Sequence, residues 1–364
     1  MNIATLPQTK PTQPTPQLAL QDKKKAQATI EYVKSVQPVD SIVKATDLGF
    51  IPLWPADNVG LMTPKFTELH EHALQQICMK ADLPWRFAQK LIKVDHGIVE
   101  EEAWGKQLLC YNLWQIYQHK PKTKYLLRSV DGQVRGFLSD RFKRLDSRGL
   151  ITAFTGSCSM VNAELYDGWH SDINVVLNTA VSKIYEPYSD MKVIYGARFK
   201  NSDFGEGAQE VMFLMVLCSS GRAIIGPDKL RKIHLGKKLN EDISKSEGDY
   251  EADQKKAASD IVERVTNTLS EHNIELMQTL VKTASETSLT DKKRSIAVEL
   301  MRRLLSKKEV DDIVKTFDES EDESIPGEKT VWRLSNIVSQ IAGDKENNDT
   351  KHDLQVLAGK LLVM

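Results

Sequence analysis

The stretch LLRSVDGQVRGFLSDRFKRLDS, residues 126–147, carries the clearest structural signal in this chain. Two short β-prone runs flank an Asp-Gly pair, and this pattern predicts a β-hairpin with a two-residue turn. If Asp131 and Gly132 form the turn, the register places Arg128 directly opposite Arg135. Like charges in that position cost stability, so the pair of arginines calls for a physical explanation.

Three explanations are open. An external phosphate can lie between the two guanidinium groups, because the planar fork of arginine matches phosphate oxygens. A carboxylate from another strand can neutralise either arginine instead, and the candidates are Glu186, Asp190 and Asp203. A turn longer than two residues would change the register and remove the opposition altogether.

On both sides of the hairpin, the sequence pattern predicts an α+β fold with a helical N-terminal layer, a central antiparallel sheet and a helical C-terminal extension. The sheet should have four or more strands and include the hairpin. The expected division of the chain is a disordered tail (1–24), an α+β core domain (25–245), a helical extension (246–318), an acidic linker (319–329) and a terminal helix with its tail (330–364).

Periodicity assigns the individual elements. Helices are expected over 26–36, 64–78, 84–93, 107–118 and 172–185, and a further short helix after the hairpin with Ser139 or Asp140 as its cap. Strands are expected over 192–200, 209–220 and 222–226. In the first of these, Arg198 shares one partly basic face with Lys192 and Lys200, while the other face is apolar.

Charge is distributed unevenly although the chain as a whole carries a net charge of −1. Residues 121–240 hold 18 Lys and Arg against 12 Asp and Glu, whereas residues 241–364 hold 18 against 26. This asymmetry indicates a polyanionic partner for the middle segment, or mutual neutralisation of the two segments.

Motifs for cofactor or metal chemistry are missing from the sequence. Gly205 and Gly207 lack the third glycine of a dinucleotide loop, and they precede a strand instead of a helix. His70 and His72 are two residues apart, so on a helix they would face different directions. No cofactor and no metal are therefore expected. The alternative of a metal-dependent nuclease would use Asp131, Asp140 and Asp146, which are read more simply as turn and cap residues.

The spacing of the cysteines and the composition of the N-terminus indicate in which cellular compartment the protein is expected. Four cysteines lie far apart without a C-x-x-C pair, which is typical of reduced thiols in a cytosol. No secretory signal is recognisable, and the longest apolar run, 211–218, is too short to span a bilayer. A cytoplasmic protein with no membrane association is expected.

A basic surface is the strongest functional candidate in the sequence, because such a groove tracks a nucleic-acid backbone without reading its bases. Its expected members are cationic side chains of the hairpin, the following turn and the later strand, with two neutral donors. They are Arg128, Arg135, Arg141, Lys143, Arg144, Lys192, Arg198, Lys200, Asn201 and Ser202.

The hairpin stretch, together with ARFKNSDFGEGA (197–208) and KIHLG (232–236), resembles a family of phage- and plasmid-encoded proteins with a domain of unknown function. The likeness covers residues 65–240. Phe142 stands where that family usually has Tyr, and Gly136 where Ala is common. The resemblance implies an origin in a mobile element and a bacterial host cell, but it implies no established activity.

From these observations the expected function is a non-catalytic nucleic-acid-binding protein. Single-stranded DNA is the expected partner, in phage recombination or replication, with strand annealing as a specific form. The first alternative is an interaction scaffold or host-defence antagonist that binds a protein through its C-terminal helices. The nuclease is the second alternative, and self-association into a ring or filament is left open.

Overall fold

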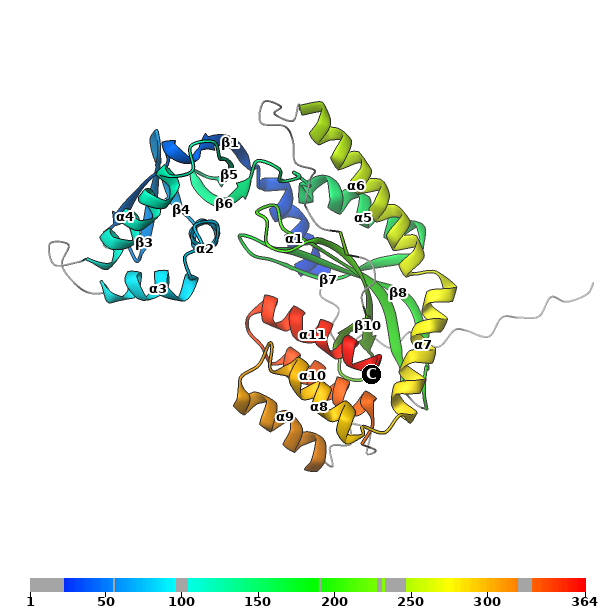
Figure 1. Cartoon of the computed structure of the whole chain (residues 1–364). Helices are drawn as coiled ribbons and strands as arrows, with labels where there is room; N and C mark the ends of the chain where they lie inside the picture. The colour runs from blue at the N-terminus through cyan, green and yellow to red at the C-terminus, as the bar shows by residue number, and fades with distance from the viewer. Residues whose placement is uncertain are drawn as a thin grey trace, which may run out of the picture.

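The computed structural model describes residues 23–54, 56–95, 104–189, 191–227, 231–232, 247–319 and 329–364. It confirms the α+β class: helices surround two sheets in which antiparallel pairing dominates (Figure 1). The expected tail and most of the expected acidic linker lie outside the described residues.

The first sheet belongs to a small lobe formed by residues 39–139, on the left of Figure 1. Its strand order is β1-β5-β6-β4-β3-β2, and only β4 and β6 run parallel. The strands are β1 (Val39–Lys44), β2 (Gly49–Leu53), β3 (Asn58–Thr63), β4 (Lys65–Leu69), β5 (Lys124–Val130) and β6 (Gln133–Ser139). Three helices, α2 (Glu71–Lys80), α3 (Trp85–Val94) and α4 (Gly105–Gln118), share a core with this sheet.

The N-terminal part is less helical than the sequence predicts. The expected helix over 64–78 begins only at Glu71, because His70 caps α2 and residues 65–69 form strand β4. The strands between residues 39 and 69 were not expected either. They are short, and β1 and β4 each pair with a strand of the hairpin, so tertiary pairing outweighs the weak local signal.

The second sheet forms the centre of a large lobe. Its strand order is β11-β10-β9-β8-β7, with β12 paired to β10. The strands are β7 (Ala163–His170), β8 (Val175–Tyr185), β9 (Val193–Asn201), β10 (Gln209–Leu217), β11 (Ala223–Ile225) and β12 (Arg231–Lys232). The predicted helix over 172–185 is therefore wrong. Its β-branched residues fill a central strand between β7 and β9, where they pack well.

Helices cover both faces of the second sheet. The face that carries Ala197 and Phe199 packs against α5 (Ser147–Met160) and α6 (Glu247–Thr268), while α1 (Lys23–Ser35) lies beside the edge strand β7. The helix after the hairpin thus starts at Ser147, and the predicted start near Ser139 or Asp140 is wrong. Helix α1 confirms the helix expected over 26–36.

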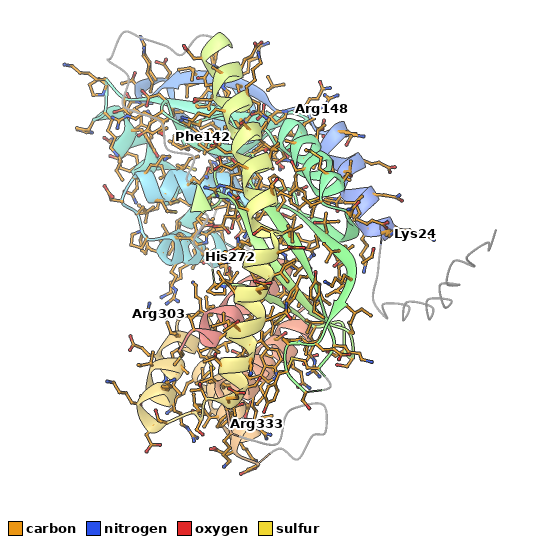
Figure 2. The ribbon with its side chains drawn as sticks, turned by 90° about the vertical axis from the view of Figure 1, so that its right-hand side faces the viewer. Lys24, Phe142, Arg148, His272, Arg303 and Arg333 are labelled. Carbon is orange, nitrogen blue, oxygen red and sulfur yellow. The ribbon has the colours of Figure 1, made fainter. Side chains whose placement is uncertain are left out.

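The C-terminal helices complete the large lobe. They are α7 (Glu271–Glu286), α8 (Asp291–Met301), α9 (Lys307–Glu319), α10 (Val331–Gly343) and α11 (Asn348–Leu362). Figure 2 shows α6 and α7 following one another along one side of the molecule. The helical C-terminal extension is confirmed, and Trp332 of α10, 1% exposed, shares a core with strands β9 and β10, so the extension packs against the second sheet. Within the described segments, none of the helices combines the length and apolar character that crossing a bilayer requires.

Candidate functional site

The hairpin has the predicted turn but a different register. Asp131 and Gly132 both have positive φ, at 51° and 80°, as a tight two-residue turn requires. A bulge shifts the pairing one residue further along, so Arg128 lies opposite Gly136 and Arg135 has no directly opposite partner. The predicted opposition of Arg128 and Arg135 is wrong, and the repulsion that it implied does not arise.

Arg128 is enclosed by the protein's own acceptors. Its side chain is 1% exposed. Nε lies 2.9 Å from Oδ1 of Asp40, and Nη2 donates to Oδ1 of Asp146 at 2.6 Å. Nη1 donates to the backbone carbonyl of Asp203 at 3.0 Å. This arginine ties β1 and β5 of the small lobe to the start of α5, and its burial separates it from any external strand.

Three more cations of the hairpin region have internal partners. Nη1 of Arg135 donates to the hydroxyl of Tyr32 at 3.1 Å and lies 3.4 Å from a carboxylate oxygen of Asp172. Arg144 forms an ion pair with Asp40, and its guanidinium stacks over the ring of Tyr250. Lys143 forms an ion pair with Asp253 at 3.0 Å.

The other predicted residues are also dispersed or occupied. Lys192 is exposed and lies 4.0 Å from Glu186, and Lys200 lies 3.8 Å from Asp349 of α11. Asn201 and Ser202 are buried and hold the loop after β9. Arg141 is half-buried. The ten predicted residues therefore do not line one open basic groove. The structure also gives no support to a phosphate bound between Arg128 and Arg135.

Arg198 differs from the other nine predicted site residues because it is a buried cation without a carboxylate partner among the described residues. The register across four strands aligns Asp167, Asn178, Arg198 and Met212 in one row on the face of the second sheet. Arg198 is only 3% exposed. Among the residues that the structure describes, no carboxylate oxygen lies within ion-pair distance of its guanidinium.

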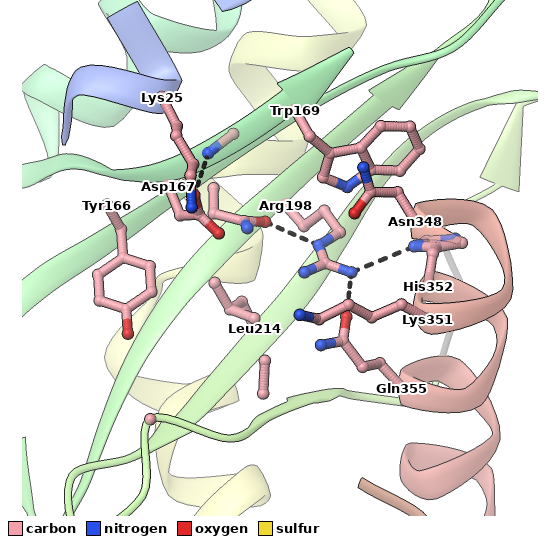
Figure 3. A pocket seen from close by; sticks show the side chains of 14 residues that line it. Lys25, Tyr166, Asp167, Trp169, Arg198, Leu214, Asn348, Lys351, His352 and Gln355 are labelled. Carbon is pink, nitrogen blue, oxygen red and sulfur yellow. Dashed lines mark hydrogen bonds between the residues drawn. The ribbon is translucent and has the colours of Figure 1, made fainter. Parts of the chain in front are cut away.

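Neutral groups hold this guanidinium in place. Nε donates to Oδ1 of Asn178 at 2.7 Å, and Nη1 donates to Oε1 of Gln355 at 2.6 Å. Nη1 also lies 3.2 Å from Nδ1 of His352, which must accept and so carries its proton on Nε2. Among the described residues the second terminal nitrogen, Nη2, has no hydrogen-bond partner, and Figure 3 shows the guanidinium between Trp169 and Leu214, two residues that line one space.

That space is a cavity of about 380 Å³ between the sheet and the first turns of α11. Its lining includes Lys25 of α1, Asp167 and Trp169 of β7, and Lys351 of α11. Burial, with the nearby Arg198 and Lys200, lowers the pKa of His352 to about 2, so the imidazole is neutral. The lining thus contains three cationic side chains, those of Lys25, Arg198 and Lys351, and one carboxylate, that of Asp167.

The cavity has a surplus of hydrogen-bond donors. Arg198 uses the side-chain oxygens of Asn178 and Gln355 as acceptors, which leaves their amide nitrogens to face elsewhere. Within the described segments, neither amide nitrogen nor Nη2 of Arg198 has a hydrogen-bond partner. Figure 3 shows the ammonium of Lys351 and the amide of Gln355 reaching from α11 toward the same space as Arg198.

Burial works against the charge of Arg198, and it lowers the pKa of this side chain to about 10, with Asp167 acting in the opposite direction. The guanidinium therefore remains charged at neutral pH. A buried charge without an ion-pair partner costs several kcal/mol relative to a paired one. This arrangement suits a site whose counter-ion arrives from outside.

The sequence predicted Arg198 as a site residue, but it did not predict the other residues that line the cavity. The alternation over 192–200 correctly separated the face of Arg198 from the apolar face of Phe199. Trp169, Lys351 and Gln355 come from distant segments with no local motif. The only sequence signal of Trp169 is its place two residues after Asp167 in a strand, and that of Lys351 and Gln355 is their spacing of four residues on one helix face.

The structure also bears on the two alternative functions, a metal-dependent nuclease and a protein that binds a partner through its C-terminal helices. Asp131 lies in the hairpin turn and Asp146 forms an ion pair with Arg128. In the part of the chain that the structure describes, no group of His, Cys, Asp and Glu side chains could hold a metal ion. The C-terminal helices α10 and α11 bury their apolar faces in the large lobe, so those faces are not available to a protein partner.

Comparison of the chain with protein-family models, with curated proteins and with solved structures gave no significant match. The resemblance to phage- and plasmid-encoded proteins therefore stays a prediction, and function has to be argued from the residues of the cavity.

Proposed function

We propose that this chain is a binding protein for a phosphate-bearing ligand and that the cavity around Arg198 is its binding site. The observation that carries the proposal is the guanidinium of Arg198: 3% exposed, held by neutral groups only, with no hydrogen-bond partner for Nη2 among the described residues. A ligand phosphate would supply both the missing negative charge and acceptors for this nitrogen.

Phosphate suits the cavity better than a carboxylate does. The free donors come from β8, β9 and α11, and so they approach the cavity from different directions. A tetrahedral anion presents oxygens to several sides, whereas a carboxylate presents two oxygens in one plane. The first turns of α11 line the same space, and the positive end of a helix dipole favours an anion there.

Single-stranded DNA, the partner expected from the sequence, stays within this class of ligand. The proposed point of contact is now the cavity and no longer the hairpin, because the arginines of the hairpin have internal partners. A role in recombination or replication would require that the phosphate of a strand enters the cavity.

Calorimetric titration of the full chain with ribose 5-phosphate tests the proposal. Substitution Lys351→Gln removes a cation of the cavity, and Lys360→Gln removes one from the exposed side of the same helix. We expect saturable binding that Lys351→Gln weakens roughly tenfold, the equivalent of ~1.4 kcal/mol, and that Lys360→Gln leaves unchanged.

Two outcomes would overturn the proposal. One is an absence of saturable binding by the wild-type chain at millimolar ligand. The other is an equal effect of Lys351→Gln and Lys360→Gln, which would indicate general electrostatic attraction instead of a site. Arg198→Gln should abolish binding, and circular dichroism would show whether that variant is folded.

A further inference from the structure

We infer, resting on the proposed function, that the ligand of the Arg198 cavity is a nucleotide unit whose base stacks on the indole of Trp169. The inference adds a recognition element to the phosphate site, and it narrows the ligand from any organic phosphate to a nucleoside phosphate.

Sheet geometry brings Trp169 to the same space as Arg198. Trp169 lies on β7 two residues after Asp167, so both side chains project from the same face of the sheet. The neighbouring row of this face contains Trp169, Val176 and Lys200. Trp169 and Asn348 both line the cavity, and Figure 3 shows the indole and Leu214 on opposite sides of Arg198.

The indole has no competing partner. It is half-buried, and in the described part of the chain no aromatic ring contacts it and no acceptor takes a hydrogen bond from its Nε1. Aromatic residues in a protein interior normally pack against other rings or satisfy their polar edge. A half-buried indole in the same cavity lining as the buried Arg198 matches the platforms on which bases stack, since every base has a π-face.

The side chain of Asn348 adds a group suited to a base edge. It is exposed at the start of α11 and lines the same cavity as the indole, and its amide both donates and accepts. Base edges also present donors and acceptors side by side. Phosphate donors, an aromatic face and an amide thus match the phosphate, the face of the base and the edge of the base of a nucleotide.

Cavity size limits the ligand to one such unit. The volume of about 380 Å³ is near the lower end of the range of ~300–1,000 Å³ for small-molecule sites. A continuous strand would need a longer groove. The unit can therefore be a free mononucleotide or the terminal nucleotide of a strand, which share the same chemistry.

The test compares dAMP with deoxyribose 5-phosphate on the full chain, in wild type and in Trp169→Ala and Trp169→Phe. We expect dAMP to bind about tenfold more tightly than the sugar phosphate. Trp169→Ala should remove this gain and leave sugar-phosphate affinity unchanged, while Trp169→Phe should keep most of it. Trp114→Ala, which removes an exposed indole of the small lobe, is the matched control and should change nothing.

The outcomes separate the two proposals. Equal affinities for dAMP and the sugar phosphate, or a gain that survives Trp169→Ala, would overturn the nucleotide inference and leave the phosphate site standing. No binding of either ligand would overturn the phosphate site itself. Tighter binding of an oligonucleotide with a 5′-phosphate than of one with a 5′-hydroxyl would identify a strand end as the source, and equal binding would identify the free nucleotide.

Discussion

Nη1 of Arg198 donates to Oε1 of Gln355 at 2.6 Å, although the two residues lie 157 positions apart in the chain. This bond joins the central strand β9 to the last helix, α11. The cavity between them therefore exists only while α11 keeps its distance from the sheet. Ligand affinity should depend on residues that set this distance even when they do not line the cavity.

Gly359 is one such residue. A Cβ atom at this position would lie 1.6 Å from the backbone oxygen of Ile225, so Gly359→Ala must move α11 away from β11. We expect this variant to lose at least ~1–3 kcal/mol of unfolding free energy in urea and to bind ribose 5-phosphate more weakly.

Gly343→Ala is the matched control for that prediction, because nothing lies within 4 Å of a Cβ atom at the end of α10. Its stability should be equal to that of the wild type or slightly higher, since alanine favours a helix. Equal stability of the two glycine variants would show that the close contact between α11 and β11 is wrong.

Arg128 should be essential for folding. Arg128→Ala leaves Asp40, a largely buried carboxylate, with one cationic partner fewer, and it removes the bridge to Asp146. Loss of one member of a buried ion pair typically costs ~3–5 kcal/mol. Urea denaturation should show a loss in this range for Arg128→Ala and a change within about 0.5 kcal/mol for Arg141→Ala. Wild-type stability of Arg128→Ala would contradict the internal ion pairs.

Asp203 should make stability fall as pH rises. Burial and the neighbouring Asp146 raise the pKa of this carboxyl to about 6 in the folded protein, above its ordinary value of 3.8. Between these values the folded state holds a proton that the unfolded state has released, so the contribution of this group to stability decreases with increasing pH.

Asp203→Asn tests that assignment. Asparagine keeps an oxygen that can accept from the amide and hydroxyl of Ser147 and from the side chain of Asn201. The difference in unfolding free energy between variant and wild type should therefore shift in favour of the variant from pH 4 to pH 6. A difference that is constant with pH would mean that Asp203 is ionised throughout.

His352 should make stability rise as the pH rises, opposite to the effect of Asp203. Its pKa is lowered to about 2 in the folded protein, so only the unfolded chain takes up a proton on this residue as the pH falls below 6.5. Its contribution to stability is complete above that pH and is lost below it, with a slope of up to ~1.4 kcal/mol per pH unit. Nitrogen NMR should show a neutral ring protonated at Nε2 down to pH 4. A ring that titrates near pH 6 would contradict its contact with Arg198.

Local sequence rules determined several parts of this protein. The Asp-Gly turn, the two-faced strand over 192–200 and helices α1, α3 and α4 follow from positive φ, period-two alternation and helical periodicity, which act over a few neighbouring residues. The same rules failed at β8, where a β-branched segment with helical spacing became a central strand because β7 and β9 pair with it.

The role of each arginine depends on contacts between segments that are distant in the chain. Arg128 and Arg198 are both buried strand residues, and nothing in their local sequence distinguishes them. One meets carboxylates of β1 and the start of α5, and the other meets amides and an imidazole. Electrostatic interactions depend on distances through space, and these are set by sheet register and helix packing between segments far apart in the chain.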